Sequence, residues 1–240
     1  MSTQLLEAHG VSCRFGRLAA LDGLNFSVRE GEMRCIIGPN GAGKTTFLNV
    51  LSGLIRPSEG QIMFDGHDIG RLSPLAIAHR GILRSFQTPG VLSGLSVETN
   101  MEIGARRPGG PRDGTQERTT HILEEFGLAP RRKMNAGDLS HGDKKRLELA
   151  MLLGGAPRML LLDEPTAGMS IRETDEIVEL LKRLCAGMTV VVIEHDMSFV
   201  RQIAERVSVF HRGTLLAEGL VDEIKADERV QSIYLGSGLD

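Results

Sequence analysis

The feature that most constrains this chain is a glycine-rich segment that matches the pattern G-x-x-x-x-G-K-[ST], namely Gly38-Pro39-Asn40-Gly41-Ala42-Gly43-Lys44-Thr45. The apolar run Met33–Ile37 precedes it, and Lys44–Leu54 follows with apolar side chains spaced for one helical face. Glycine lets the backbone form a concave loop whose N–H groups converge on an anion, and the helix adds its partial positive charge. A glycine-rich turn with an incidental lysine is the alternative, but the flanking strand and helix favour a triphosphate site. In such a site Lys44 reaches the β and γ phosphates and the Thr45 hydroxyl ligates Mg²⁺.

Strand-like and helical patterns alternate along much of the chain. Early strand-like segments are Leu5–Val11, Leu24–Val28 and the hairpin edge Gln61–Asp65. Later ones are Gly81–Phe86, Met159–Asp163, Thr189–Glu194 and Val207–Phe210, with a helix expected at Glu173–Leu184. This alternation predicts an α/β fold with a parallel sheet that is covered on both faces.

A run of helical patterns interrupts the alternation. It comprises Val97–Ala105, Gln116–Phe126 and Lys144–Leu153, and the Pro- and Gly-rich stretch 106–114 between the first two has loop composition. We therefore expect one domain over residues 1–240. Its nucleotide-binding core, with an antiparallel β part, comprises 1–87 and 156–240, and a helical subdomain is inserted at 88–155.

Two acids end one of the apolar strands, in Leu161-Leu162-Asp163-Glu164-Pro165. In open α/β sheets, ligands bind at the carboxyl ends of the strands. Asp163 is therefore expected near the metal, and Glu164 is expected to orient and polarise the attacking water. The alternative is that these acids only solvate a strand end. The presence of a phosphate loop in the same chain favours the catalytic interpretation.

A second anion site is predicted where Leu139-Ser140-His141-Gly142-Asp143 opens a helix. A single chain has no use for a second γ-phosphate site beside its own phosphate loop. Two chains have such a use, if each places this segment against the nucleotide that the other holds.

These motifs together resemble the ATPases of ABC transporters, and the resemblance covers nearly the whole chain. It implies a P-loop NTPase fold with a RecA-like parallel core sheet, an N-terminal antiparallel β subdomain and an inserted helical subdomain. The usual family signature reads Leu-Ser-Gly-Gly-Gln, so this chain departs from it at His141 and Asp143 while keeping Ser140 and Gly142.

The resemblance also implies roles for residues outside these motifs. Gln87 would link Mg²⁺ and water to a membrane partner, His195 would touch the γ phosphate, and Phe15 would stack on adenine. Thr46 would support the α phosphate. Residues 167–170 match the family's D-loop, although Ser170 stands where many relatives carry aspartate. An ordinary loop amide for Gln87, a capping or solvated role for His195 and a core position for Phe15 are the alternatives.

Within this family the chain is most similar to the ATPases of bacterial branched-chain amino-acid importers and their urea-importing relatives. The similarity lies in residues 162–169, 195–200 and 230–236. It implies a second ATPase subunit, identical or related, that forms a dimer around ATP. It further implies transmembrane permease subunits, indirect action with a periplasmic binding protein, and a peripheral location on the cytoplasmic face of the inner membrane.

Composition excludes several other classes. The net charge is −3, only 4% of residues are aromatic and tryptophan is absent, so nucleic-acid binding is not expected. No apolar run approaches the roughly 20 residues of a membrane span, and the first ten residues lack the pattern of an export signal. A soluble ABC ATPase without a transporter stays open as an alternative, although no sustained heptads separate Thr45 from Leu139.

Overall fold

The computed structural model describes residues 3–86, 90–106 and 115–236, and divides into two compact units. The first comprises residues 1–77 and 187–240, and the second comprises 78–186. Gln87 lies outside the described residues. None of the helices within the described part of the chain combines the length and the apolar character that a membrane span requires.

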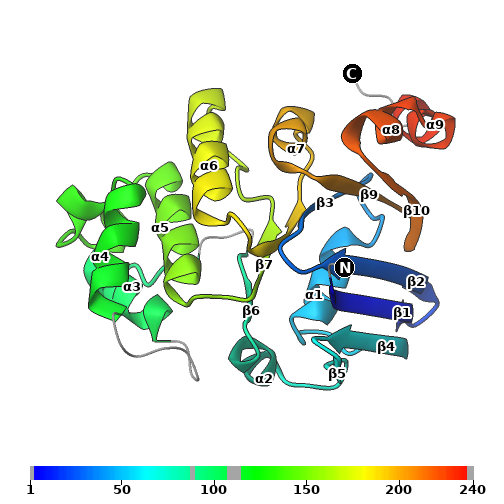
Figure 1. The fold of residues 1–240 in the computed structure, drawn as a ribbon, viewed down its shortest axis with the longest axis horizontal. Helices are drawn as coiled ribbons and strands as arrows, with labels where there is room; N and C mark the ends of the chain where they lie inside the picture. The colour runs from blue at the N-terminus through cyan, green and yellow to red at the C-terminus, as the bar shows by residue number, and fades with distance from the viewer. Residues whose placement is uncertain (1–2, 87–89, 107–114, 237–240) are drawn as a thin grey trace. The chain divides into compact units, whose positions relative to one another are not determined.

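The first unit opens with an antiparallel sheet in the order β2-β1-β4-β5 (Figure 1). Its strands are β1 (Gln4–Phe15), β2 (Leu18–Arg29), β4 (Glu59–Phe64) and β5 (His67–Asp68). Buried and exposed side chains alternate along β2, which is typical of a strand with one face in a core. The turn Asp65-Gly66 joins β4 to β5, as the hairpin pattern predicts.

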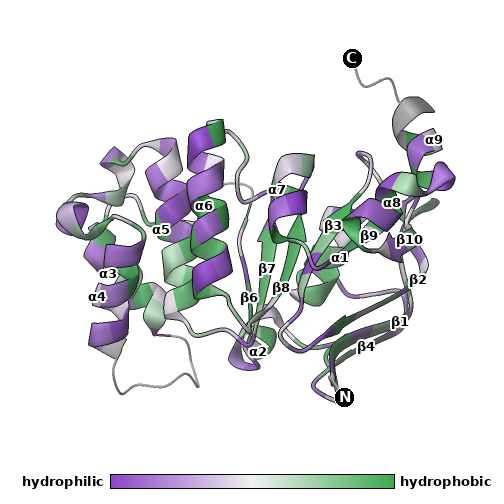
Figure 2. Cartoon of the chain, turned by 45° about the horizontal axis from the view of Figure 1, so that its top comes forward, coloured by the Kyte–Doolittle hydropathy of each residue, from purple (hydrophilic) through white to green (hydrophobic). Residues whose placement is uncertain are grey.

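The same unit contains four strands in the order β10-β9-β3-β8. They are β3 (Met33–Ile37), β8 (Thr189–Ile193), β9 (Arg206–His211) and β10 (Thr214–Gly219). β3 is parallel to both β8 and β9, whereas β10 is an antiparallel edge strand. Every side chain of β3 and β8 is buried, as expected for parallel strands covered on both faces, and β8 is largely green in Figure 2.

Helix α1 (Lys44–Leu51) follows the phosphate loop and joins the two sheets of this unit. Its fully buried Phe47 lies with ring centroids 5.0 Å from Phe26 of β2 and 5.5 Å from Phe210 of β9. Aromatic pairs in this geometry stabilise a fold by more than the burial of their apolar area alone. The remaining helices that the structure describes in the unit are α7 (Met197–Ile203), α8 (Val221–Ala226) and α9 (Glu228–Gly236), and α2 (Pro74–His79) spans its boundary at residue 77.

In its described residues, the second unit contains a parallel strand pair and four α-helices. The strands are β6 (Ile82–Arg84) and β7 (Met159–Asp163). The helices are α3 (Val97–Ala105), α4 (Thr115–Glu125), α5 (His141–Gly154) and α6 (Ile171–Leu184), with short 3-10 helices at Ala129–Arg131 and Ala136–Asp138. α3 approaches α5 closely at Gly104, where an added Cβ would lie 2.7 Å from the Met151 Cβ.

Several boundaries differ from those that the sequence predicts. β3, α3 and β7 have the predicted bounds, but α1 ends at Leu51 rather than Leu54, because Gly53 takes a φ of +73°. α5 begins at His141 rather than Lys144, because Ser140 caps it. The insertion expected at 88–155 stays a prediction.

Candidate nucleotide site

The phosphate loop has the backbone that its glycines permit. Gly38, Gly41 and Gly43 take φ values of 147°, 78° and 99°. Gly43 occupies the N-cap position of α1 without a side-chain cap, so the first amides of this helix have no capping side-chain acceptor at that position. No acidic residue lies in the first turn of α1 to compete with an anion. The loop therefore presents a concave row of amides at a helix N-terminus.

Backbone carbonyl groups of neighbouring segments pack closely against this loop. A Cβ at Gly38 would lie 2.2 Å from the Phe210 carbonyl oxygen, and one at Gly43 would lie 2.5 Å from the Ala20 carbonyl oxygen. The Gly213 N–H donates to the Ala42 carbonyl at 3.0 Å. Two glycines of the motif are thus required by close approach as well as by φ.

Lys44 is buried and turns back over the loop. Its Nζ donates to the carbonyl oxygens of Gly38 at 2.6 Å and Pro39 at 3.0 Å. Thr45 is exposed and Thr46 is half-buried, and both lie in the first turn of α1. Asn40 and Gly41 are exposed at the tip, so the open side of the loop faces solvent within this unit.

Two further predicted residues lie in the same unit. β8 pairs with β3 in parallel, with Ile36 opposite Ile193, so the strand end that carries His195 lies beside the strand end that starts the phosphate loop. His195 is exposed, and its N–H donates to the Glu194 carboxylate at 3.0 Å. Phe15 is half-exposed at the end of β1, next to the turn into β2.

The acids of β7 belong to the second unit. Asp163 is only 1% exposed, its Oδ2 accepts from Arg84 at 3.0 Å, and its N–H donates to the Ser85 hydroxyl at 3.0 Å. Its buried Oδ1 has no hydrogen-bond partner among the residues that the structure describes. Burial raises the pKa of the Asp163 carboxyl above its ordinary value, although the Arg84 guanidinium opposes this shift.

Glu164 follows in an unusual backbone conformation. It is half-buried, and its φ of +49° is one of only four positive values at non-glycine positions among the residues that the structure describes. A left-handed residue with a side chain costs about 1 kcal/mol or more, and such conformations concentrate at functional sites. The turn is fixed by the Ala167 N–H, which donates to the Glu164 carbonyl at 3.1 Å.

The segment 139–143 forms the start of α5, also in the second unit. Ser140 caps this helix, with its hydroxyl accepting from the Asp143 N–H at 3.1 Å. Gly142 is buried against α6, where an added Cβ would lie 2.5 Å from Glu173 Oε1. The His141 ring nitrogen Nε2 lies 3.3 Å from the Ala167 carbonyl, so this segment touches the loop 166–170.

Sequence reasoning missed three charged residues beside these motifs: Arg84, Lys145 and Glu148. All three have buried side chains, and they hold Asp163 or the backbone on either side of residues 87–89. The i,i+3 spacing of Lys145 and Glu148 on an expected helix was a visible signal. A surface ion pair has the same spacing, however, so the pattern alone could not show burial.

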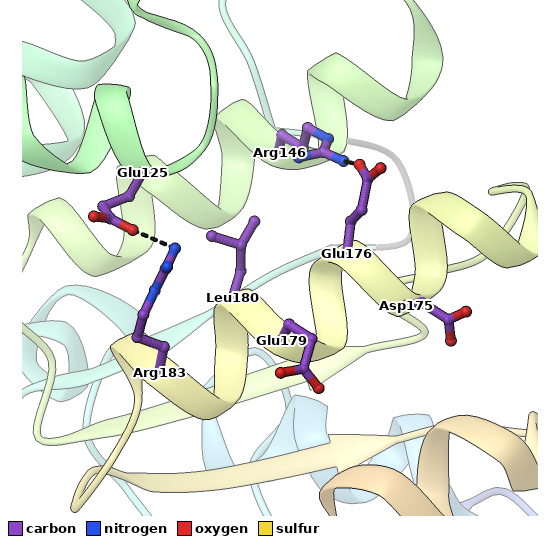
Figure 3. A pocket seen from close by; sticks show the side chains of 7 residues that line it. All are labelled: Glu125, Arg146, Asp175, Glu176, Glu179, Leu180 and Arg183. Atoms are coloured by element: carbon purple, nitrogen blue, oxygen red, sulfur yellow. Dashed lines mark hydrogen bonds and ion pairs between the residues drawn. The ribbon is translucent and has the colours of Figure 1, made fainter.

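A groove of about 410 Å³ lies elsewhere in the second unit, between α4, α5 and α6 (Figure 3). Leu180 is the apolar member of its lining. Ion pairs Arg146–Glu176 and Arg183–Glu125 close two of its sides. None of the predicted site residues lines this groove.

Comparison with known proteins gives a consistent family assignment. A family model described as ABC transporter matches residues 21–167, and one described as branched-chain amino acid ATP-binding cassette transporter matches 214–240. The chain is 36% identical to the high-affinity branched-chain amino acid transport ATP-binding protein BraF of Pseudomonas aeruginosa, covering 98% of this chain and 99% of BraF. It is 34% identical, over the same shares of the two chains, to LivG of Escherichia coli, whose name describes the same activity.

Solved structures show the same similarity. One is the ADP conformation of the ATP-binding cassette MJ1267, with a TM-score of 0.88, 32% identity, and coverage of 98% of this chain and 100% of that chain. Another is a dimeric post-hydrolysis state of the ATP-binding cassette MJ0796 bound to ADP and Pi. Its TM-score is 0.79, its identity is 28%, and coverage is 90% of this chain and 98% of that chain.

Proposed function

Because this chain belongs to the ABC transporter family, we propose that it is the ATP-hydrolysing subunit of an importer for branched-chain amino acids. The observation that carries this proposal is the near-full-length similarity to BraF and LivG, combined with an intact phosphate loop. Each relative is named for the ATP-binding part of such a transporter. The terminal match at residues 214–240 supports the same solute class.

ATP binding is assigned to the phosphate loop. The amides of residues 38–45 and the N-terminus of α1 would take the phosphate oxygens, since they already form a concave row with partial positive charge. Lys44 would exchange its bonds to the Gly38 and Pro39 carbonyls for the β and γ phosphates. Phe15, exposed at a turn, would stack on adenine, and Thr46 would support the α phosphate.

Mg²⁺ fits the residues that the family resemblance assigns to it. Asp163 Oδ1 is a buried carboxylate oxygen without a hydrogen-bond partner in the described part of the chain, and carboxylate oxygen is the donor type that Mg²⁺ prefers. Thr45 offers an exposed hydroxyl at the start of α1, and Gln87 would contribute an amide oxygen. The metal would neutralise charge on the phosphates during transfer.

Hydrolysis is assigned to Glu164 and His195. Glu164 would accept a proton from the attacking water, and its fixed left-handed backbone would hold the carboxylate without rearrangement. His195, beside the end of β3, would donate a hydrogen bond to the γ phosphate. Gln87 would position the same water.

A dimer around ATP is part of the proposal. Ser140, Gly142 and the first amides of α5 would contact the γ phosphate of nucleotide held by a second chain, and His141 and Asp143 would line that contact. The similar cassette MJ0796 is described as dimeric with ADP and Pi. Permease subunits would bind the dimer at the membrane surface, and a periplasmic binding protein would deliver solute to them.

Two measurements test this function together. Purified protein should release phosphate from Mg-ATP, and Lys44→Ala should weaken nucleotide binding because it removes the cation that meets the phosphates. In a strain that lacks the gene, the wild-type chain should restore uptake of radiolabelled leucine, whereas Lys44→Ala should not. Restored urea uptake alone would point to the urea-importing alternative. Phosphate release without restored uptake of either solute would favour a soluble ABC ATPase.

A further inference from the structure

The side chain of Glu148, on the second turn of α5, holds backbone on both sides of residues 87–89. Its Oε1 accepts from the N–H of Phe86 at 3.1 Å and from the N–H of Gly90 at 3.0 Å. Glu148 is only 4% exposed. One buried carboxylate therefore bridges the two ends of the segment that carries Gln87.

Lys145 completes this contact from one turn earlier on the same helix. Its Nζ donates to the Phe86 carbonyl at 3.1 Å and lies 3.8 Å from Glu148 Oε2. Lys145 is 1% exposed. Both backbone groups of Phe86 are thus bound by charged side chains of α5.

Holding backbone with two buried charged side chains has a high desolvation cost. Burying a charge costs several kcal/mol unless pairing and hydrogen bonds offset it, and apolar residues of similar volume often give a more stable fold. Burial raises the pKa of the Glu148 carboxyl, against the opposing effects of the Gly90 and Phe86 amides and of Lys145. Stability alone is therefore a weak explanation for this pair.

The backbone just before Phe86 is also held, by contacts with β7. Ser85 donates its N–H to the Leu161 carbonyl and accepts from the Asp163 N–H, and Arg84 is paired with Asp163. Arg84 and Ser85 are consequently tied to the acidic end of β7, and the backbone of Phe86 and Gly90 is tied to α5. α5 in turn is capped at its N-terminus by Ser140, the residue assigned above to a second chain's γ phosphate.

We propose that Lys145 and Glu148 are positioning residues that couple the Ser140 end of α5 to the backbone on either side of Gln87. This inference rests on the proposed function. When α5 engages nucleotide held by the second chain, its movement carries the backbone of Phe86 and Gly90 with it, because Glu148 and Lys145 hold that backbone. Hydrolysis and ATP-driven closure are thereby linked through one helix.

The contact is tested first by amide hydrogen exchange at Phe86 and Gly90. Glu148→Ala should speed exchange at both amides about tenfold, because each loses its acceptor. Glu148→Gln retains a carbonyl oxygen at the same place and should keep most of the protection. Leu147→Ala is the matched control: Leu147 is fully buried on the same helix but belongs to no bond of this contact. It should destabilise the protein without selective exposure of the two amides.

Activity then separates coupling from structure. Glu148→Ala should lower kcat for ATP about tenfold while leaving the KM and the nucleotide affinity within about twofold, because the phosphate loop is untouched. Glu148→Gln should recover most of kcat. Leu147→Ala should have a kcat close to that of the wild type when it is assayed below the melting temperature of this variant. A wild-type kcat in Glu148→Ala, or an equal loss in Leu147→Ala, would overturn the coupling alone. Absence of ATP turnover by the wild-type protein would instead overturn the proposed function and the coupling that rests on it.

Discussion

Individual glycines in the phosphate loop differ in what surrounds them, although all carry the same motif label. A Cβ added at Gly43 would lie against the Ala20 carbonyl oxygen, whereas no heavy atom lies within 4 Å of the Cβ position of Gly41. Both have positive φ values, 99° and 78°. The loop is therefore constrained by packing at its helix end and by conformation alone at its tip.

This difference predicts unequal effects of the same substitution. Gly41→Ala should cost about 1 kcal/mol of unfolding free energy, which is the cost of a left-handed alanine. Gly43→Ala adds a clash at 2.5 Å with backbone and should cost several kcal/mol or prevent folding. Urea unfolding of the two variants measures the difference. Equal losses of unfolding free energy would show that the backbone at Ala20 shifts to accommodate the added methyl group.

At the scale of elements, the sequence predicts the strands and helices around the motifs well. β3, α3 and β7 have the expected bounds because short, mainly apolar runs and a helical period leave little ambiguity, although β3 also contains the buried Arg34. The edge strand β10 and the short helices α2, α7, α8 and α9 were not predicted. Short elements of this kind are stabilised by tertiary contacts rather than by pattern.

The site follows the same division. The glycine loop after β3 and the acids at the end of β7 could be located because each motif is contiguous in sequence, and their roles stay predictions. The contact of His141 with Ala167 joins residues 26 positions apart, and the bonds from Glu148 to Phe86 and Gly90 span 62 and 58 positions. No local pattern encodes such pairings, so only the folded chain reveals them.

Ser140 has two separable tasks at the start of α5, and one substitution can distinguish them. Ser140→Ala removes the cap and should cost about 1 kcal/mol of stability in addition to any effect on phosphate binding. Ser140→Asp keeps a good capping acceptor but places a negative charge where the γ phosphate of a second chain is proposed to bind. It should melt near the wild-type temperature and yet fail to dimerise with ATP, as judged by size-exclusion chromatography. Normal ATP-dependent dimerisation of Ser140→Asp would exclude this helix end as the phosphate contact.

At the scale of the whole molecule, the proposal makes ATP the bridge between two chains, so slowing hydrolysis should trap the bridged form. Glu164→Gln removes the proposed base while the amide keeps nearly the same shape, and general-base losses typically lower rates by about 10²–10⁴. We expect this variant to bind ATP normally, to elute as a stable dimer with Mg-ATP and to release phosphate at that reduced rate. Glu179→Gln, an exposed site on α6, is the matched control and should turn over and dissociate as the wild type does. Wild-type hydrolysis by Glu164→Gln would remove Glu164 as the base. Loss of hydrolysis without accumulation of the dimer would contradict the proposal that the γ phosphate holds the two chains together.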